Sequence, residues 1–187
     1  MKITAKDVYQ LFQIIETKRL SISEAIMLLS YHSSATTKSK SIKEIISLTV
    51  DYGRNLEQMI EVGEYDHVNV NITEQNFSLA TELRGQKTSV TSQLIHFGCD
   101  ISSEDAMLAI NKIGHPLATL PELLALGEAY PDLQFQFPII AFGSIWHDAS
   151  GRLRVPYLVV DGTRRKLELY WFDYGWHANC RFLVICK

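Results

Sequence analysis

Residues 138–187 constrain the fold most strongly, because four apolar stretches follow one another there with only short turns between them. Asp161 and Gly162 separate two of these stretches, and Asp-Gly between apolar runs is the strongest short-range signal for a β-hairpin. Strands that are joined by such short turns pair antiparallel. The sequence therefore predicts a mostly antiparallel sheet whose last four strands lie at residues 138–146, 152–160, 165–171 and 179–186.

Residues 63–137 supply the other elements that we expect in the same domain. Val residues that alternate with polar ones over 64–73 predict a short extended segment, and residues 88–97 read as a strand. Helix-start patterns predict helices over 102–113 and 119–130. Since the helices are grouped rather than alternating with the strands, the predicted class is α+β, with a mostly antiparallel sheet and two helices in a domain spanning residues 63–187.

Residues 1–62 predict a separate helical module at the N-terminus. Apolar residues recur at helical spacing over 8–15, and a capping-box pattern at Ser21 starts a second helix. A stretch rich in Ser, Thr and Lys over 33–41 is typical of a linker, and the apolar pattern over 42–63 predicts another helix. We interpret the first two helices as a small module or a self-association arm. A DNA-binding helix-turn-helix is the alternative, but the helices lack a basic recognition face.

Composition limits the classes of function. The chain has 187 residues, 47% of them hydrophobic, which is enough for one good core. Its formal charge of -3 speaks against a nucleic-acid partner, because such binders are more often basic. Three Cys without a framework pattern fit a reducing compartment. We see neither a signal peptide nor a membrane-spanning run, and so we expect a cytoplasmic protein without a membrane partner.

Catalytic signatures are missing from the sequence, and we expect no cofactor. Metalloprotease, P-loop and nucleophile-elbow patterns do not occur. His147, Asp148 and His177 nevertheless lie at the ends of predicted strands, where they could form an acid/base or metal site if their loops meet. Polar residues over 66–71 resemble metal ligands, but they are more simply the polar face of an alternating strand. We therefore predict no metal site and keep an enzyme as the alternative.

Three short motifs resemble the C-type-lectin-like fold, in the branch shared by formylglycine-generating domains and the variable proteins of diversity-generating retroelements. Residues 116–126 resemble the helix-start motif of that branch, Phe142-Gly-Ser-Ile-Trp146 is similar to its Gly-x-x-Trp strand, and residues 180–187 are similar to its closing strand with Arg and Phe swapped. The resemblance covers about residues 90–187. Residues 63–187 also resemble a family of uncharacterised bacterial proteins.

The resemblance implies a binding surface rather than an enzyme. Cys180 and Cys186 lack the pattern that surrounds the catalytic cysteines of formylglycine-generating enzymes, and the calcium-ligand motifs of lectins are absent. In the retroelement proteins the varied residues lie on the last strands and their connecting loop. The corresponding positions here are Tyr170, Trp171, Asp173, Tyr174, Trp176, His177 and Asn179.

The residue types at these positions independently suit a binding patch. Tyr and Trp supply large rigid contact area, and Asn, Asp and His supply adaptable hydrogen bonds. The competing interpretation is that Trp171 and Trp176 belong to the core and that Gly175 makes a tight turn. We predict a non-enzymatic module that binds a protein or a small ligand. The alternatives are the enzyme with His147, His177 and Asp148, and a protein that contacts partners through its N-terminal helices.

Overall fold

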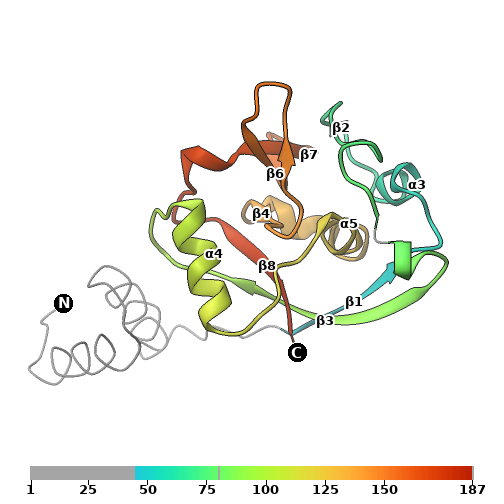
Figure 1. The fold of residues 1–187 in the computed structure, drawn as a ribbon, viewed down its shortest axis with the longest axis horizontal. Coiled ribbons are helices and arrows are strands. Elements are labelled where there is room, and N and C mark those ends of the chain that lie inside the picture. Colours follow the sequence, from blue (N-terminus) through green and yellow to red (C-terminus); the bar gives the residue numbers. More distant parts are fainter. Residues whose placement is uncertain (1–44, 80, 187) are drawn as a thin grey trace, which may run out of the picture. The chain divides into compact units, whose positions relative to one another are not determined.

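The structure is a computed structural model that describes residues 45–79 and 81–186 (Figure 1). The predictions for the N-terminal helical hairpin, the linker over 33–41 and self-association through these helices lie outside the described residues. The described part has the predicted α+β class. Its strands are β1 (Ile46–Asp51), β2 (His67–Val68), β3 (Lys87–Ile95), β4 (Ile139–Ile140), β5 (Trp146–His147), β6 (Leu153–Asp161), β7 (Arg164–Trp171) and β8 (Arg181–Ile185). Its helices are α3 (Leu56–Glu61), α4 (Ser103–Lys112) and α5 (Leu120–Ala129), with short 3-10 helices η1 (Thr81–Leu83), η2 (Pro131–Phe135) and η3 (Phe172–Tyr174).

The strands form one mixed sheet in the order β1-β3-β8-β4-β6-β7-β2, and β5 pairs with β6 beside this path. Within the described residues every pairing is antiparallel except β4 with β8 and β2 with β7. The longest ladder is the β6–β7 hairpin, in which Asp161 pairs with Arg164 across the Asp-Gly turn. The hairpin that the Asp-Gly signal predicted is thus confirmed.

The prediction of a helix over residues 42–63 is wrong for its first part. Residues Ile46–Asp51 form strand β1, which pairs antiparallel with β3, and only α3 is helical. Ile46, Leu48 and Val50 are buried while the residues between them face solvent, which is the two-residue period of a half-buried strand. Ile42, Ile45 and Ile46 also fit a helical period, so the local pattern was compatible with either a helix or a strand. Pairing with β3, some forty residues away in sequence, stabilises the strand.

The single strand predicted over residues 138–146 is in fact two short strands, β4 and β5. Between them the backbone N–H of Gly143 donates to the carbonyl of Ala118 at 2.8 Å, so the chain leaves the sheet to contact the segment before α5. A Cβ at residue 143 would lie 2.6 Å from that carbonyl oxygen. Only glycine permits this close approach.

Two cores flank the sheet, because successive strand residues point to opposite faces. Leu183 of β8 belongs to the aliphatic core that α5 covers with Leu120, Leu123 and Leu124. The neighbouring Phe182 packs instead among aromatic rings, including Phe142 and Trp176. The α5 face is the main hydrophobic core, and the aromatic face borders the candidate site described below.

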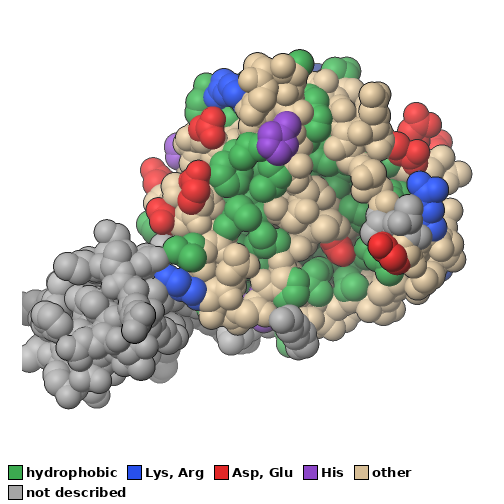
Figure 2. Space-filling view, in the orientation of Figure 1, with side chains coloured by type: hydrophobic (Ala, Val, Ile, Leu, Met, Phe, Trp, Pro, Cys, Tyr) green, Lys and Arg blue, Asp and Glu red, His purple; other side chains and the backbone are tan. Residues whose placement is uncertain are grey.

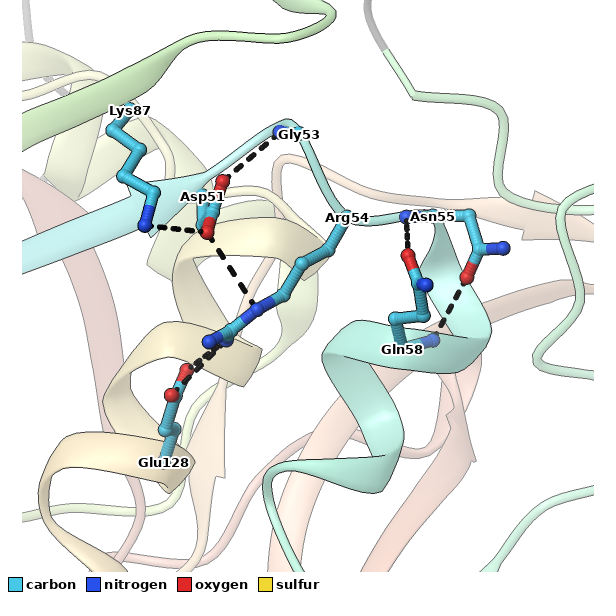
Figure 3. Close-up of polar contacts among 7 residues, drawn as sticks. All are labelled: Asp51, Gly53, Arg54, Asn55, Gln58, Lys87 and Glu128. Carbon is cyan, nitrogen blue, oxygen red and sulfur yellow. Dashed lines mark hydrogen bonds and ion pairs between the residues drawn. The ribbon is translucent and has the colours of Figure 1, made fainter.

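Capping boxes start two of the helices. At α3 the Asn55 side chain accepts from the N–H of Gln58 at 2.8 Å, and the Gln58 side chain accepts from the N–H of Asn55 at 3.0 Å (Figure 3). At α5 the Glu122 carboxylate accepts from the N–H of Thr119 at 2.6 Å. This second cap is the one that the Thr-x-x-Glu pattern predicted.

A charged cluster ties the turn after β1 to α5 (Figure 3). The Asp51 carboxylate accepts from the N–H of Gly53 at 3.1 Å and pairs with the Lys87 ammonium at 3.0 Å. Arg54 bridges Asp51 to Glu128, which it contacts at 2.8 Å. The Lys87 contact holds the pKa of Asp51 below its usual value.

Arg165 of β7 joins four segments of the domain. Its guanidinium donates to the carbonyls of Gly63 at 2.6 Å and Gly127 at 2.9 Å and to the side-chain oxygen of Gln134 at 3.1 Å. It also lies 5.0 Å from the centroid of the Tyr65 ring. These contacts commit the donors of Arg165 to the fold.

Candidate binding pocket

A tight loop after β7 positions the candidate site. The chain runs from Trp171 into η3 and then through Gly175, whose φ is 70° and ψ is -179°. Trp176 pairs with Ile101 in an isolated antiparallel bridge, with backbone hydrogen bonds of 2.8 and 3.0 Å. The bridge places the segment before α4 beside the aromatic loop, although seventy-five residues separate the two in sequence.

Replacement of Gly175 by alanine should lower the free energy of unfolding by about 2 kcal/mol, because glycine is nearly the only residue that adopts this φ and ψ combination. The new Cβ would also lie 3.1 Å from the carbonyl oxygen of Ile101. Urea unfolding measures the loss. Gly151→Ala is the matched control, because Gly151 also has a positive φ but nothing lies within 4 Å of its added Cβ. An equal loss in both variants would show that the close approach to Ile101 adds nothing to the cost of the positive φ.

The loop and the segment before α4 border an open pocket of about 390 Å³. This volume lies within the range of small-molecule sites, which are roughly 300–1,000 Å³. The lining residues are Asp100, Ile101, Ser102, Tyr170, Asp173, Tyr174, Gly175, Trp176 and His177. Five of the seven residues predicted for the binding surface are therefore brought together around one cavity.

Trp176 is the most buried of these rings, with 5% of its surface exposed. Its indole N–H donates to the hydroxyl of Ser103 at 2.8 Å, and that hydroxyl donates to the carbonyl of Phe172 at 2.6 Å. Its ring centroid lies 5.0 Å from that of Tyr170. Trp176 thus belongs to the aromatic core, as one of the two interpretations made from the sequence expected, and it also forms part of the wall of the pocket.

Tyr174 is the most accessible of the tyrosine and tryptophan rings of the pocket, with 62% of its surface exposed. Its ring lies 6.1 Å from Tyr170 at an interplanar angle of 78°. Tyr170 is half-buried and packs edge-on against Tyr157, also half-buried. Burial raises the pKa of Tyr157 to about 12, so its hydroxyl stays protonated at neutral pH. Of the tyrosine and tryptophan rings of the pocket, Tyr174 is therefore the one that a ligand can reach most freely.

Trp171 and Asn179 do not line the pocket. The guanidinium carbons of Arg152 and Arg154 lie 3.7 and 3.3 Å from the centroid of the Trp171 ring. Asn179 is exposed, and its carbonyl accepts from Arg181 at 2.7 Å. Trp171 supports the loop from the side of the β6–β7 hairpin through cation–π contacts.

Asp100, which the sequence analysis did not single out, lies at the pocket rim. Its carboxylate accepts from the backbone N–H of Ala178 at 2.9 Å and lies 3.8 Å from the Nδ1 atom of His177. On the other side of this loop the Nε2 atom of His96 lies 2.8 Å from the carbonyl of Ala178. Burial lowers the pKa of His96, which favours the neutral ring. Asp100 and His96 together fix the end of the aromatic loop.

His147 and Asp148, which the enzyme alternative requires, lie outside the pocket lining. His147 pairs with Leu153 in the β5–β6 ladder. The Asp148 carboxylate accepts from the Ser150 hydroxyl at 2.6 Å and from the N–H of Arg152 at 3.0 Å, and the hydroxyl contact lowers its pKa. The structure therefore uses Asp148 to close a turn.

Metal-ligand clusters of three or more His, Cys, Asp or Glu residues do not occur among the described residues. His67 contacts Glu168 at 3.0 Å, and Asn69 donates to the same carboxylate at 2.8 Å, which fastens β2 to β7. Cys180 is buried and free, and burial raises the pKa of its thiol. Cys186 is also free.

Comparison with known proteins gives no relative for this chain. No family model, curated protein or solved structure matches it. In the part of the chain that the structure describes, no helix is long and apolar enough to cross a membrane. The function must therefore be argued from the pocket itself.

Proposed function

We propose that the protein is a non-enzymatic binding module whose pocket at the aromatic loop holds a small ligand or a side chain of a partner protein. One observation carries the proposal: a cavity of about 390 Å³ lies at the loop that the sequence marked as a binding surface. Large exposed aromatic residues beside hydrogen-bonding groups are the usual composition of a binding hot spot.

The fixed geometry of the loop supports this proposal. The bridge between Ile101 and Trp176 and the contacts of Asp100 and His96 hold the backbone around the pocket. A ligand that enters such a preformed site loses little free energy to ordering of the protein. Tyr174 contributes contact area without being required for the core, because most of its surface is exposed.

The C-type-lectin-like resemblance predicts a binding surface at the same loop. The relationship of the fold to that family stays a prediction. An enzyme that uses His147, His177 and Asp148 is the weaker proposal. The Asp148 carboxylate accepts hydrogen bonds within its own turn, from Ser150 and Arg152. Of the three residues, only His177 lines the pocket.

Tyr174→Ala should abolish capture of the ligand or partner while the fold persists. The experiment immobilises the full chain, exposes it to native cell extract and identifies captured proteins and small molecules by mass spectrometry. Tyr130→Ala is the matched control, because Tyr130 is also exposed, at 43%, and does not line the pocket. Species captured by wild type and Tyr130→Ala but not by Tyr174→Ala would support the proposal. Equal capture by all three proteins would contradict it.

A further inference from the structure

We infer that the pocket recognises a cationic amine, of the ammonium or methylated ammonium type, and this inference rests on the proposed function. Its lining contains two carboxylates, those of Asp100 and Asp173, and none of the described residues that line it is Lys or Arg. Figure 2 shows acidic side chains over the N-terminal end of α4 and the neighbouring loop, where this pocket lies.

The aromatic rings supply the second half of the recognition. Tyr170 and Tyr174 meet at 78°, and Tyr170 and Trp176 meet at 49°, so the three rings form a corner rather than a parallel stack. The faces of aromatic rings carry negative electrostatic potential and attract cations, and cages of this kind hold methylated ammonium groups. An amine in this corner would contact the exposed ring of Tyr174 and the half-buried ring of Tyr170, while the buried Trp176 closes the corner behind them.

Both carboxylates retain capacity for a ligand. Asp100 accepts one hydrogen bond, from Ala178, and its side chain is 76% exposed. Asp173 forms a partly exposed ion pair with Arg152 at 3.8 Å, a distance too long for a direct hydrogen bond, so this contact leaves its acceptor positions open. A carboxylate has about four acceptor positions. Arg152 itself lies 5.3 Å from the ring centroid of Tyr174, so this ring already attracts one cation of the protein.

An anionic ligand is disfavoured by the same surroundings. The N-terminus of α4 reaches the pocket at Ser102, and a helix N-terminus attracts anions. Here the Ser102 hydroxyl already accepts from the N–H of Asp105 at 3.1 Å, and Glu104 and Asp105 occupy the first turn. These carboxylates complement the helix dipole, and they leave the rim negative.

The test compares choline with its neutral isostere 3,3-dimethyl-1-butanol, which has the same shape without the charge. Binding to the full chain is measured from the NMR shifts of the backbone amides over residues 170–177. We expect choline to bind about 10-fold more tightly than the neutral alcohol. A short peptide that contains trimethyl-lysine distinguishes the two sources of the amine: tighter binding of the peptide indicates a protein side chain, and equal binding indicates a free amine.

Variants assign the binding to the pocket. Tyr174→Phe keeps the ring and should keep choline affinity, whereas Tyr174→Ala should weaken it about 10-fold. Asp100→Asn combined with Asp173→Asn should weaken it to a similar extent. The matched control, Glu61→Gln with Asp132→Asn, removes two exposed charges outside the pocket lining and should have no effect.

Three outcomes would overturn the inference. Equal binding of choline and the neutral alcohol, with both lost in Tyr174→Ala, would refute selectivity for a cation but leave the pocket as a binding site. Choline binding that survives in Tyr174→Ala would place the amine elsewhere. If neither choline nor the trimethyl-lysine peptide shifts the pocket amides at roughly 10 mM, the pocket does not recognise an amine. The capture experiment with Tyr174→Ala would then still decide the proposed function separately.

Discussion

Trp176→Ala should lower the free energy of unfolding by about 4 kcal/mol, the loss typical of a buried Trp or Phe cut back to alanine. The indole packs against Phe142 at 5.7 Å and Phe182 at 6.0 Å between ring centroids, and its N–H is bonded to Ser103. Its removal leaves a cavity in the aromatic core and takes away the donor to a buried hydroxyl. Urea unfolding followed by circular dichroism measures the effect.

The control is Trp171→Ala, because Trp171 lies on the same loop but is only half-buried, between two arginines. Its loss should cost about 1 kcal/mol, in the range of exposed cation–π contacts. If both variants lost the same stability, Trp176 would not be the anchor of the loop. Because Trp176→Ala disturbs the core, it is unsuitable for binding tests, and Tyr174 is the residue to change there.

Arg165→Met should lower the free energy of unfolding by about 3 kcal/mol. The guanidinium satisfies the carbonyls of two buried glycines, Gly63 and Gly127, and a buried carbonyl left without a partner costs about 1–3 kcal/mol. Arg165→Lys should recover only part of this, since one ammonium cannot reproduce the planar fork of donors. Chemical unfolding of the three proteins gives the differences.

Arg164→Met is the matched control, because Arg164 is the exposed neighbour on the same strand. Its effect should stay within about 0.5 kcal/mol, as for most surface substitutions. If Arg165→Met were as mild as Arg164→Met, the bonds of Arg165 to Gly63, Gly127 and Gln134 would not contribute to stability.

The elements that local signals define were predicted well. The Asp-Gly turn predicted the β6–β7 hairpin, and the Thr119–Glu122 pattern predicted the start of α5. In both cases the residues that interact lie within a few positions of one another, so a short stretch of sequence is enough to predict the structure.

Two features that depend on distant partners were missed. β1 was assigned to a helix because Ile42, Ile45 and Ile46 fit a helical period, and its partner β3 begins only at Lys87. The interruption after β4 depends on the contact of Gly143 with Ala118, which no local pattern indicates.

For the candidate site, too, the sequence predicted one part, and the other part depends on a distant contact. Aromatic residues clustered between Tyr170 and Trp176 marked one wall of the pocket in the sequence. The other wall, Asp100 to Ser102, became visible only through the bridge between Ile101 and Trp176. Asp173 and His177 were predicted as binding residues, but their acidic neighbour Asp100 was not. The cationic character of the expected ligand therefore follows from the tertiary structure.

Site-specific photocrosslinking tests the central claim most directly. A benzoylphenylalanine placed at position 174 keeps an aromatic ring at the pocket, and the same group at position 130 samples an exposed surface outside its lining. After irradiation in native extract, the binding account predicts a discrete crosslinked species from position 174 that is absent from position 130. Identical crosslinks from both positions, or crosslinks from position 130 alone, would contradict it.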